Sequence, residues 1–195
     1  MDYGIIGGLP FDTTQSSAMQ ILGYLFLLII TDAIAGVYAT KMGARTDGFF
    51  LHRAGWARWV RHILRQACFY VLCWCALCGL LSILLLPRTV YAVGIFSVYA
   101  VFCAAVQTLL ILTFRNAQAG LLPVIFLQLC SLYFSKALPG QWKLLLFGNW
   151  GSYLRTTFYG ADGIAWFTAL AIEVAGIAGI YVAGWRLIRY MNQKR

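Results

Sequence analysis

The run VYAVGIFSVYAVFCAAVQTLLILTF, residues 90–114, contains no charged side chain. A helix needs roughly 20 apolar residues to cross a hydrocarbon core about 30 Å thick, and this run exceeds that length. Four more apolar runs of similar length occupy residues 18–39, 67–87, 117–135 and 164–188. A soluble protein of 195 residues could not hide five such surfaces in one core. The sequence therefore predicts an all-α fold, a polytopic membrane bundle of five transmembrane helices that forms one transmembrane domain over residues 1–195.

The composition fits a chain whose solvent is lipid. Hydrophobic residues make up 62% of the sequence and charged residues 11%, against roughly 25% charged residues in globular domains. The sequence contains no Gly-Lys nucleotide-binding loop, so we expect this chain to bind no cofactor. The net charge of +9 could indicate nucleic acid, but in a membrane protein loops held against anionic lipid explain it more simply. Membrane lipid is therefore an expected partner, and nucleic acid is not.

All six cysteines lie within the apolar runs, which argues against the disulfide framework of a secreted domain. Cys75 and Cys78 form a CxxC, but no histidine pair accompanies them, and a zinc site needs several converging ligands. No metal site is predicted.

An uneven distribution of positive charge sets the predicted threading. If five spans alternate, eleven of the fifteen Lys and Arg residues share one side, namely Lys41, Arg45, Arg53, Arg58, Arg61, Arg65, Arg115, Arg186, Arg189, Lys194 and Arg195. The other side receives Arg88, Lys136, Lys143 and Arg155. By the positive-inside rule, the amino terminus is outside and the carboxyl terminus is cytoplasmic.

Residues 49–66 are predicted to form a cytoplasmic amphipathic helix, because the part RAGWARWVRHILRQ, residues 53–66, is too highly charged to cross. On a helix, one face carries Trp56, Trp59, Val60, Ile63 and Leu64, and the opposite face carries Arg58, Arg61, His62 and Arg65. Such a helix lies flat in the membrane interface with its rings toward lipid. It is either a lipid anchor or a docking surface for a cytoplasmic partner, and both interpretations stay open.

Residues 137–163, ALPGQWKLLLFGNWGSYLRTTFYGADG, form the longest predicted outside connection. The run is apolar and aromatic, yet its glycines exclude one long helix. Short helices that dip into the outer leaflet as a re-entrant segment satisfy both features. The segment is either a loop resting on lipid or an outer gate, for which the candidate residues are Trp142, Asn149, Trp150 and Arg155.

Four polar residues lie inside predicted spans. A charge at bilayer depth costs roughly 2.5–3.5 kcal/mol, so Asp32 and Glu173 should face protein or water. Gln107 and Gln128 are weaker cases of the same kind, for which hydrogen bonding between helices is the simpler explanation. All four are candidates for lining a cavity or a substrate path.

Small residues in the last span repeat every four positions, at Ala175, Gly179 and Ala183. Small side chains let two helices approach closely. The repeat predicts that this span packs against another helix along that stripe.

The order of these elements resembles the permease subunits of type-2 ABC exporters. The family's cytoplasmic helix has a pattern of glycine, apolar residues and spaced arginines before an aromatic residue, matched here by Gly48, Phe49, Phe50, Leu51, Arg53, Arg58 and Trp59. Phe147–Gly151 with Arg155 is similar to the outer re-entrant segment of the bacteriocin and lantibiotic export or immunity subgroup. The family usually has six spans and a glutamate before the cytoplasmic helix. With five predicted spans, we expect the counterpart of the family's first span to be missing here, and Asp47 stands near the glutamate's place.

The resemblance implies a non-enzymatic export permease in the bacterial cytoplasmic membrane, carrying an amphipathic or peptide-like substrate. ATP and Mg²⁺ would be bound by a separate ATP-binding cassette subunit, docked on Arg53, Trp56, Arg58, Trp59 and Arg61. A second permease copy or a full-length permease homologue would complete the transporter.

Two alternatives remain from the sequence. One is a membrane cysteine peptidase in which His62 would activate Cys68, although the glycine-rich lead into the histidine of such enzymes is missing. The other is a helper subunit that stabilises another membrane protein without transporting anything.

Overall fold

The computed structural model describes residues 5–12, 16–44, 48–159 and 163–193. Within them the chain forms five α-helices: α1 (Ala18–Ala44), α2 (Gly48–Leu85), α3 (Val90–Phe114), α4 (Ala117–Phe134) and α5 (Trp166–Gln193). Each contains a stretch long and apolar enough to cross a membrane. This confirms the predicted helical bundle of a multi-pass membrane protein. The observed helix α3 begins and ends at the predicted residues, and α4 ends one residue before the predicted boundary. Helices α1 and α5 continue about five residues past the predicted ends, and α2 begins well before the predicted start of the second span.

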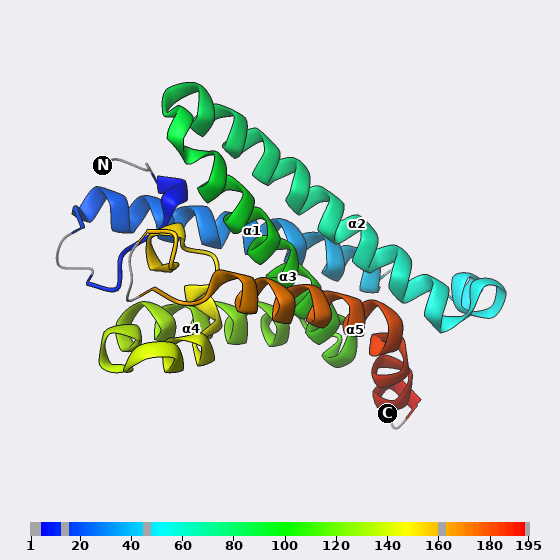
Figure 1. Ribbon diagram of the computed structural model, residues 1–195. Coiled ribbons are helices and arrows are strands. Elements are labelled where there is room, and N and C mark those ends of the chain that lie inside the picture. The colour runs from blue at the N-terminus through cyan, green and yellow to red at the C-terminus, as the bar shows by residue number, and fades with distance from the viewer. Residues whose placement is uncertain (1–4, 13–15, 45–47, 160–162, 194–195) are drawn as a thin grey trace.

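Helix α3 is the centre of the bundle. It contacts α1, α2, α4 and α5, and in Figure 1 it passes between the other helices. In its most apolar stretch 61% of the residues are buried, against 17% to 33% in the other four helices. A helix that is hydrophobic on all sides belongs in the interior. The uncharged run 90–114 therefore lies in the interior of the bundle, where none of its faces has to contact water.

The helices alternate in direction, which places the charged segments as the sequence predicts. The start of α2, the turn between α3 and α4 and the last part of α5 lie at one end of the bundle, which we call the basic end (Figure 1). The turn is short because Arg115 takes a left-handed conformation with φ of 55°. Asn116 then caps α4 by accepting a hydrogen bond from the Gln118 amide at 2.9 Å. The N-terminal segment and the connection after α4 lie at the opposite end.

The predicted boundary between an interfacial helix and the second span is not present. Helix α2 contains one non-helical residue, Gly55, with φ of 72° and ψ of 154°, a conformation that glycine adopts without steric cost. From Ala57 to Leu85 the helix is continuous. The amphipathic stretch is therefore an extension of the spanning helix, and the break in direction comes at Gly55.

The apolar face of this stretch packs against protein, not lipid. Trp59, Val60, Ile63 and Leu64 are buried in a cluster with residues of α3 and with Ile188 of α5. The described apolar residues of the stretch are used for helix packing, because α2 packs against α3 and α5 there.

The connection after α4 consists of short 3₁₀ turns: η4 (Ser135–Ala137), η5 (Gly140–Leu145), η6 (Phe147–Asn149) and η7 (Tyr153–Arg155). Two glycines let it approach the helices closely. A Cβ at Gly151 would lie 2.2 Å from the Tyr99 ring, and a Cβ at Gly148 would lie 2.7 Å from the Ser131 side chain. The predicted short helices are thus present and packed on α3 and α4, while their depth in a bilayer stays a prediction.

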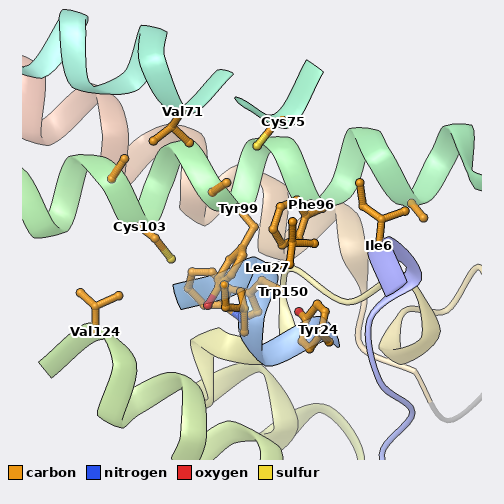
Figure 2. Close-up of a cluster of buried hydrophobic side chains, with 14 of the residues drawn as sticks. Ile6, Tyr24, Leu27, Val71, Cys75, Phe96, Tyr99, Cys103, Val124 and Trp150 are labelled. Carbon is orange, nitrogen blue, oxygen red and sulfur yellow. The ribbon is translucent and has the colours of Figure 1, made fainter. Parts of the chain in front are cut away.

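The main hydrophobic cluster joins this connection to the bundle. Figure 2 shows Tyr99 and Phe96 of α3 beside Tyr24 and Leu27 of α1, with Trp150 of the connection close to them. The rings of Tyr24 and Phe96 meet edge to face at 6.4 Å between centroids, a favourable arrangement for aromatic pairs.

The predicted packing of the small-residue stripe is wrong within this chain. Ala175, Gly179 and Ala183 are exposed. Helix α5 instead packs on α3 through the adjacent face, where Gly176 lies against Phe102 and Gly184 lies close to Leu109. The small residues that are used for close approach are therefore the two glycines outside the stripe.

Candidate functional site: a buried polar centre and an arginine cluster

The four polar residues predicted to line a cavity are all buried in the bundle. Asp32 is 2% exposed, Gln107 0%, Gln128 4% and Glu173 1%. They come from α1, α3, α4 and α5, so each of these helices turns its polar residue inward. This is the arrangement that the cost of polar groups in lipid requires.

Cys103 of α3 is in direct contact with one of these residues, Gln128. The Gln128 amide donates to the Cys103 sulfur at 3.7 Å and is also within hydrogen-bonding reach of the Asp32 carboxyl. Gln107 lies one turn after Cys103 on α3 and faces Gly36 of α1, where a Cβ would be 2.7 Å from the Gln107 Nε2. Glu173 lies within electrostatic range of Cys103. We call Asp32, Cys103, Gln107, Gln128 and Glu173 the polar centre.

Several side-chain atoms of the polar centre have no hydrogen-bond partner among the described residues. They are Asp32 Oδ2, Glu173 Oε1 and both polar atoms of the Gln107 amide. Next to them on α3, the hydroxyls of Tyr99 and Thr108 are also without a partner there. An unsatisfied buried polar group costs about 1–3 kcal/mol. These atoms leave hydrogen-bonding capacity unused in the interior of the bundle.

Among the described residues, no cationic side chain forms an ion pair with either of the two buried carboxyls. In the described ranges the one ion pair joins Lys136 to Asp12 at 3.1 Å, at the end opposite the basic end. Neither Asp32 nor Glu173 takes part in it. The chemistry of the polar centre is therefore that of acceptor oxygens with two amides, which suits a cationic or hydrogen-bond-donating ligand better than an anion.

A second buried polar group lies at the end opposite the basic end, around Arg155. This arginine is 0% exposed although it belongs to the connection between α4 and α5. Its Nε donates to the Leu9 carbonyl at 2.8 Å, and its Nη2 donates to the Pro10 carbonyl at 3.2 Å. Its Nη1 donates to the Ser131 carbonyl at 3.0 Å, to the Ser135 hydroxyl at 3.1 Å and to Asn149 Oδ1. We call Arg155 and these five partners the arginine cluster.

The arginine cluster joins three separate parts of the chain, namely the N-terminal segment, the end of α4 and the connection itself. All five acceptors are uncharged, which is unusual for a buried arginine because buried charges are normally paired with charges. Burial lowers the pKa of Arg155 to about 10, so the guanidinium keeps its charge at neutral pH. The Phe11 ring lies 5.4 Å from the guanidinium carbon and adds a cation–π contact.

The other predicted gate residues divide into two groups. Asn149 is buried, donates to the Lys143 carbonyl at 2.7 Å and accepts from Ser135 at 2.6 Å. Trp150 is buried and donates to the Leu144 carbonyl at 3.0 Å. Trp142 is exposed. The structure thus brings Asn149, Trp150 and Arg155 into one packed unit and leaves Trp142 on the surface.

The predicted docking residues also differ from one another in exposure. Arg58 is exposed, whereas Trp59 is 8% exposed and packs inside the bundle. Arg61 donates to the Tyr181 carbonyl of α5 at 3.3 Å. The side chains of Arg53 and Trp56 lie outside the described residues. Of the predicted set, Arg58 is therefore the described side chain most available to a partner.

The structure gives no support to a His62 and Cys68 catalytic pair. The two residues lie six positions apart on the continuous part of α2, which separates them by about 9 Å along the helix axis. Six positions also turn them to different faces, since neighbouring side chains on a helix are three or four apart. His62 is exposed, and the Cys68 sulfur instead faces the Val101 carbonyl at 4.0 Å.

The arginine cluster contains residues that the sequence did not indicate. Ser131 near the end of α4 and Ser135 at the start of η4 are four positions apart, which is a detectable polar pair at the end of an apolar helix. Leu9 and Pro10 contribute only backbone carbonyls, which any residue could supply. Cys103 of the polar centre and the nearby Tyr99 could not be identified from the sequence either, because both lie in an apolar run and show no distinctive spacing.

No protein-family model, no curated protein and no solved structure matches this chain. Among the described residues no group of three or more His, Cys, Asp or Glu side chains could hold a metal ion.

Proposed function

We propose that this chain is the permease subunit of an ABC-type exporter in a bacterial cytoplasmic membrane. A separate subunit would hydrolyse ATP, and a second permease chain would complete the path for an amphipathic or peptide-like substrate. The observation that supports this best is the polar centre. Four helices of a membrane bundle turn acceptor oxygens and amides inward, and within the described part of the chain no cationic side chain forms an ion pair with them.

In this proposal the polar centre binds the polar or cationic part of the substrate. Asp32 and Glu173 supply negative charge or hydrogen-bond acceptors, and Gln107 and Gln128 supply amides. The surrounding walls are apolar, with Leu28 and Val124 buried on the neighbouring helices, and suit the apolar part of the same molecule. An amphipathic molecule therefore matches the site better than a small inorganic ion.

The arginine cluster would then be the outer gate. It holds the connection after α4 against the N-terminal segment and the end of α4, so the path from the polar centre cannot open at this end while its hydrogen bonds persist. Release of the substrate would require Arg155 to leave at least the Leu9 and Pro10 carbonyls. The gate and the polar centre are linked by Tyr99, which packs on the connection through Gly151 and lies one turn from Cys103.

The ATP-binding subunit would dock at the basic end. A co-purification experiment tests this with the ATP-binding subunit expressed beside the chain. Arg58→Glu should abolish co-purification while the protein still inserts into the membrane. Arg189→Glu is the matched control, because Arg189 is also an exposed arginine at the basic end. Unchanged co-purification of Arg58→Glu would refute the docking role and favour a lipid anchor.

A second candidate function is a helper subunit without transport activity. The exposed stripe of Ala175, Gly179 and Ala183 favours it, because such a surface allows close approach by a helix of another membrane protein. A complex that retains a partner permease but never contains an ATP-binding subunit would identify the helper role. In that case Ala175→Leu and Gly179→Leu should each reduce retention of the partner.

A further inference from the structure

A groove lies between α2 and α5, with α3 as its floor, and its volume is about 310 Å³. Its apolar lining includes Leu64, Cys68, Leu72, Val101, Ile177 and Ile180. Along α2 the lining extends from Leu64 to Leu72, which corresponds to a length of about 12 Å along the helix. The groove is thus long, narrow and apolar, and it starts within the basic end of the bundle.

The charged groups of the groove stand at one end only. Arg65 is among the lining residues and is exposed. Arg61, one helical turn earlier, reaches across to α5 and lies 5.6 Å above the Tyr181 ring while donating to its carbonyl. In the direction of Leu72 the lining contains no further charged residue. The groove therefore has a cationic end and an apolar end.

No carboxylate in the described parts of the chain forms an ion pair with Arg61 or Arg65. Like charges one turn apart on a helix repel each other. An anion placed between them removes this repulsion, and guanidinium groups bind phosphate through paired N–H donors. Because Arg65 lies where the apolar part of α2 begins, such an anion would sit at the level of the lipid headgroups.

The side of the groove that faces outward is apolar as well. Phe69 and Leu72 of α2 are both large and exposed, at 56% and 46%. In a bilayer these side chains contact lipid tails, so the groove opens to the hydrocarbon and not to water. A ligand that combines an anionic group at the interface with a single apolar chain matches both ends.

We propose that this groove is a binding site for an anionic phospholipid, with its phosphate between Arg61 and Arg65 and one acyl chain along Cys68 and Leu72. The site does not depend on transport activity, and it would stabilise the contact between α2 and α5. The bound lipid replaces the missing carboxylate partner of the two arginines. A zwitterionic lipid fits the apolar part equally well but gains less at the cationic end.

Native mass spectrometry of the purified full-length chain tests the proposal. The protein is delipidated in detergent and titrated with phosphatidylglycerol or with phosphatidylcholine of the same acyl chains. Each basic residue near an anionic headgroup changes affinity roughly fivefold, so we expect phosphatidylglycerol to bind about 25-fold more tightly. The double variant Arg61→Gln/Arg65→Gln should bind both lipids equally, and Arg189→Gln should keep the preference of the wild type.

Larger side chains at Cys68 test the acyl-chain part of the proposed site separately from the phosphate part. Cys68→Phe should weaken binding of both lipids by a similar factor, and Cys68→Leu provides the smaller change if the phenylalanine variant does not fold. Equal affinity of the wild type for both lipids would overturn the site. So would a preference that survives in the double arginine variant, or binding that is unchanged in both Cys68 variants.

Discussion

Replacing Arg155 by methionine removes all five hydrogen bonds that the guanidinium donates while keeping a long side chain at the position. The guanidinium donates to three backbone carbonyls, one hydroxyl and one amide oxygen. Hydrogen bonds of a charged group contribute at least about 1.5 kcal/mol each, or about 7.5 kcal/mol for the set of five. Desolvation of the buried charge offsets several kcal/mol of that sum.

The net cost of Arg155→Met is therefore about 3 kcal/mol. For a chain of 150–250 residues, each kcal/mol lowers the Tm by about 2–4 °C, which gives an expected decrease of about 6–12 °C. Arg155→Lys keeps the charge but cannot reproduce the planar set of donors, so its decrease should be smaller than that of Arg155→Met. The assay is thermal unfolding of the purified protein in detergent, followed by size-exclusion chromatography of heated samples.

Lys136→Gln is the matched control for this experiment. Lys136 lies at the same end of the bundle, but its side chain is 65% exposed and its ion pair with Asp12 is accessible to solvent. Exposed ion pairs contribute about 0.2–1 kcal/mol, so the Tm should decrease by no more than about 4 °C. A variant Arg155→Met with the Tm of the wild type would show that the buried cluster does not stabilise the closed end, and the gate proposal would lose its physical basis.

Three further predictions concern packing, threading and the polar centre. Gly151→Ala should destabilise the protein by about 1–3 kcal/mol because the added methyl group collides with the buried Tyr99 ring. Gly94→Ala is the control: its methyl group meets open space, so the variant should be neutral or slightly stabilising in the same unfolding assay. With a membrane-impermeant maleimide on intact cells, Lys136→Cys should be labelled and Arg58→Cys should not. The opposite labelling would show that the basic end faces outward, contrary to the predicted orientation. Glu173→Gln should change the ATP-hydrolysis rate of the complex with its ATP-binding subunit while expression stays normal, and reduced expression with an unchanged rate would assign Glu173 to packing.

The apolar helices could be located well from the sequence because the hydropathy of consecutive residues is enough to identify them. Each span is a run of apolar residues whose length is fixed by membrane thickness, and α3 has the predicted bounds. Sequence reasoning misjudged the stretch before the second span, where the charge pattern alone suggested a separate interfacial helix. The pattern of Trp59 and Ile63 identifies an apolar face but does not distinguish lipid from another helix as the surface it contacts.

The candidate site was predictable in its residue types and not in its connections. A carboxyl or amide in an apolar run must turn inward, so Asp32, Gln107, Gln128 and Glu173 were correctly expected to be buried. Their convergence around Cys103 depends on the relative rotation of four helices. That rotation follows from packing among many side chains, such as the close approach of Gly120 to α3, and no single residue encodes it.

The sequence by itself determined that this chain forms five helices long and apolar enough to cross a membrane, and at which end of the bundle the positive charge collects. These properties follow from local composition, because hydropathy and charge act residue by residue along the chain. Only the tertiary structure decided that Arg155 would be buried, that its partners would include carbonyls of Leu9 and Pro10 some 145 positions away, and that the stripe on α5 would face outward. Backbone carbonyls are common to every residue, so a side chain that binds them leaves no trace in the sequence of its partners.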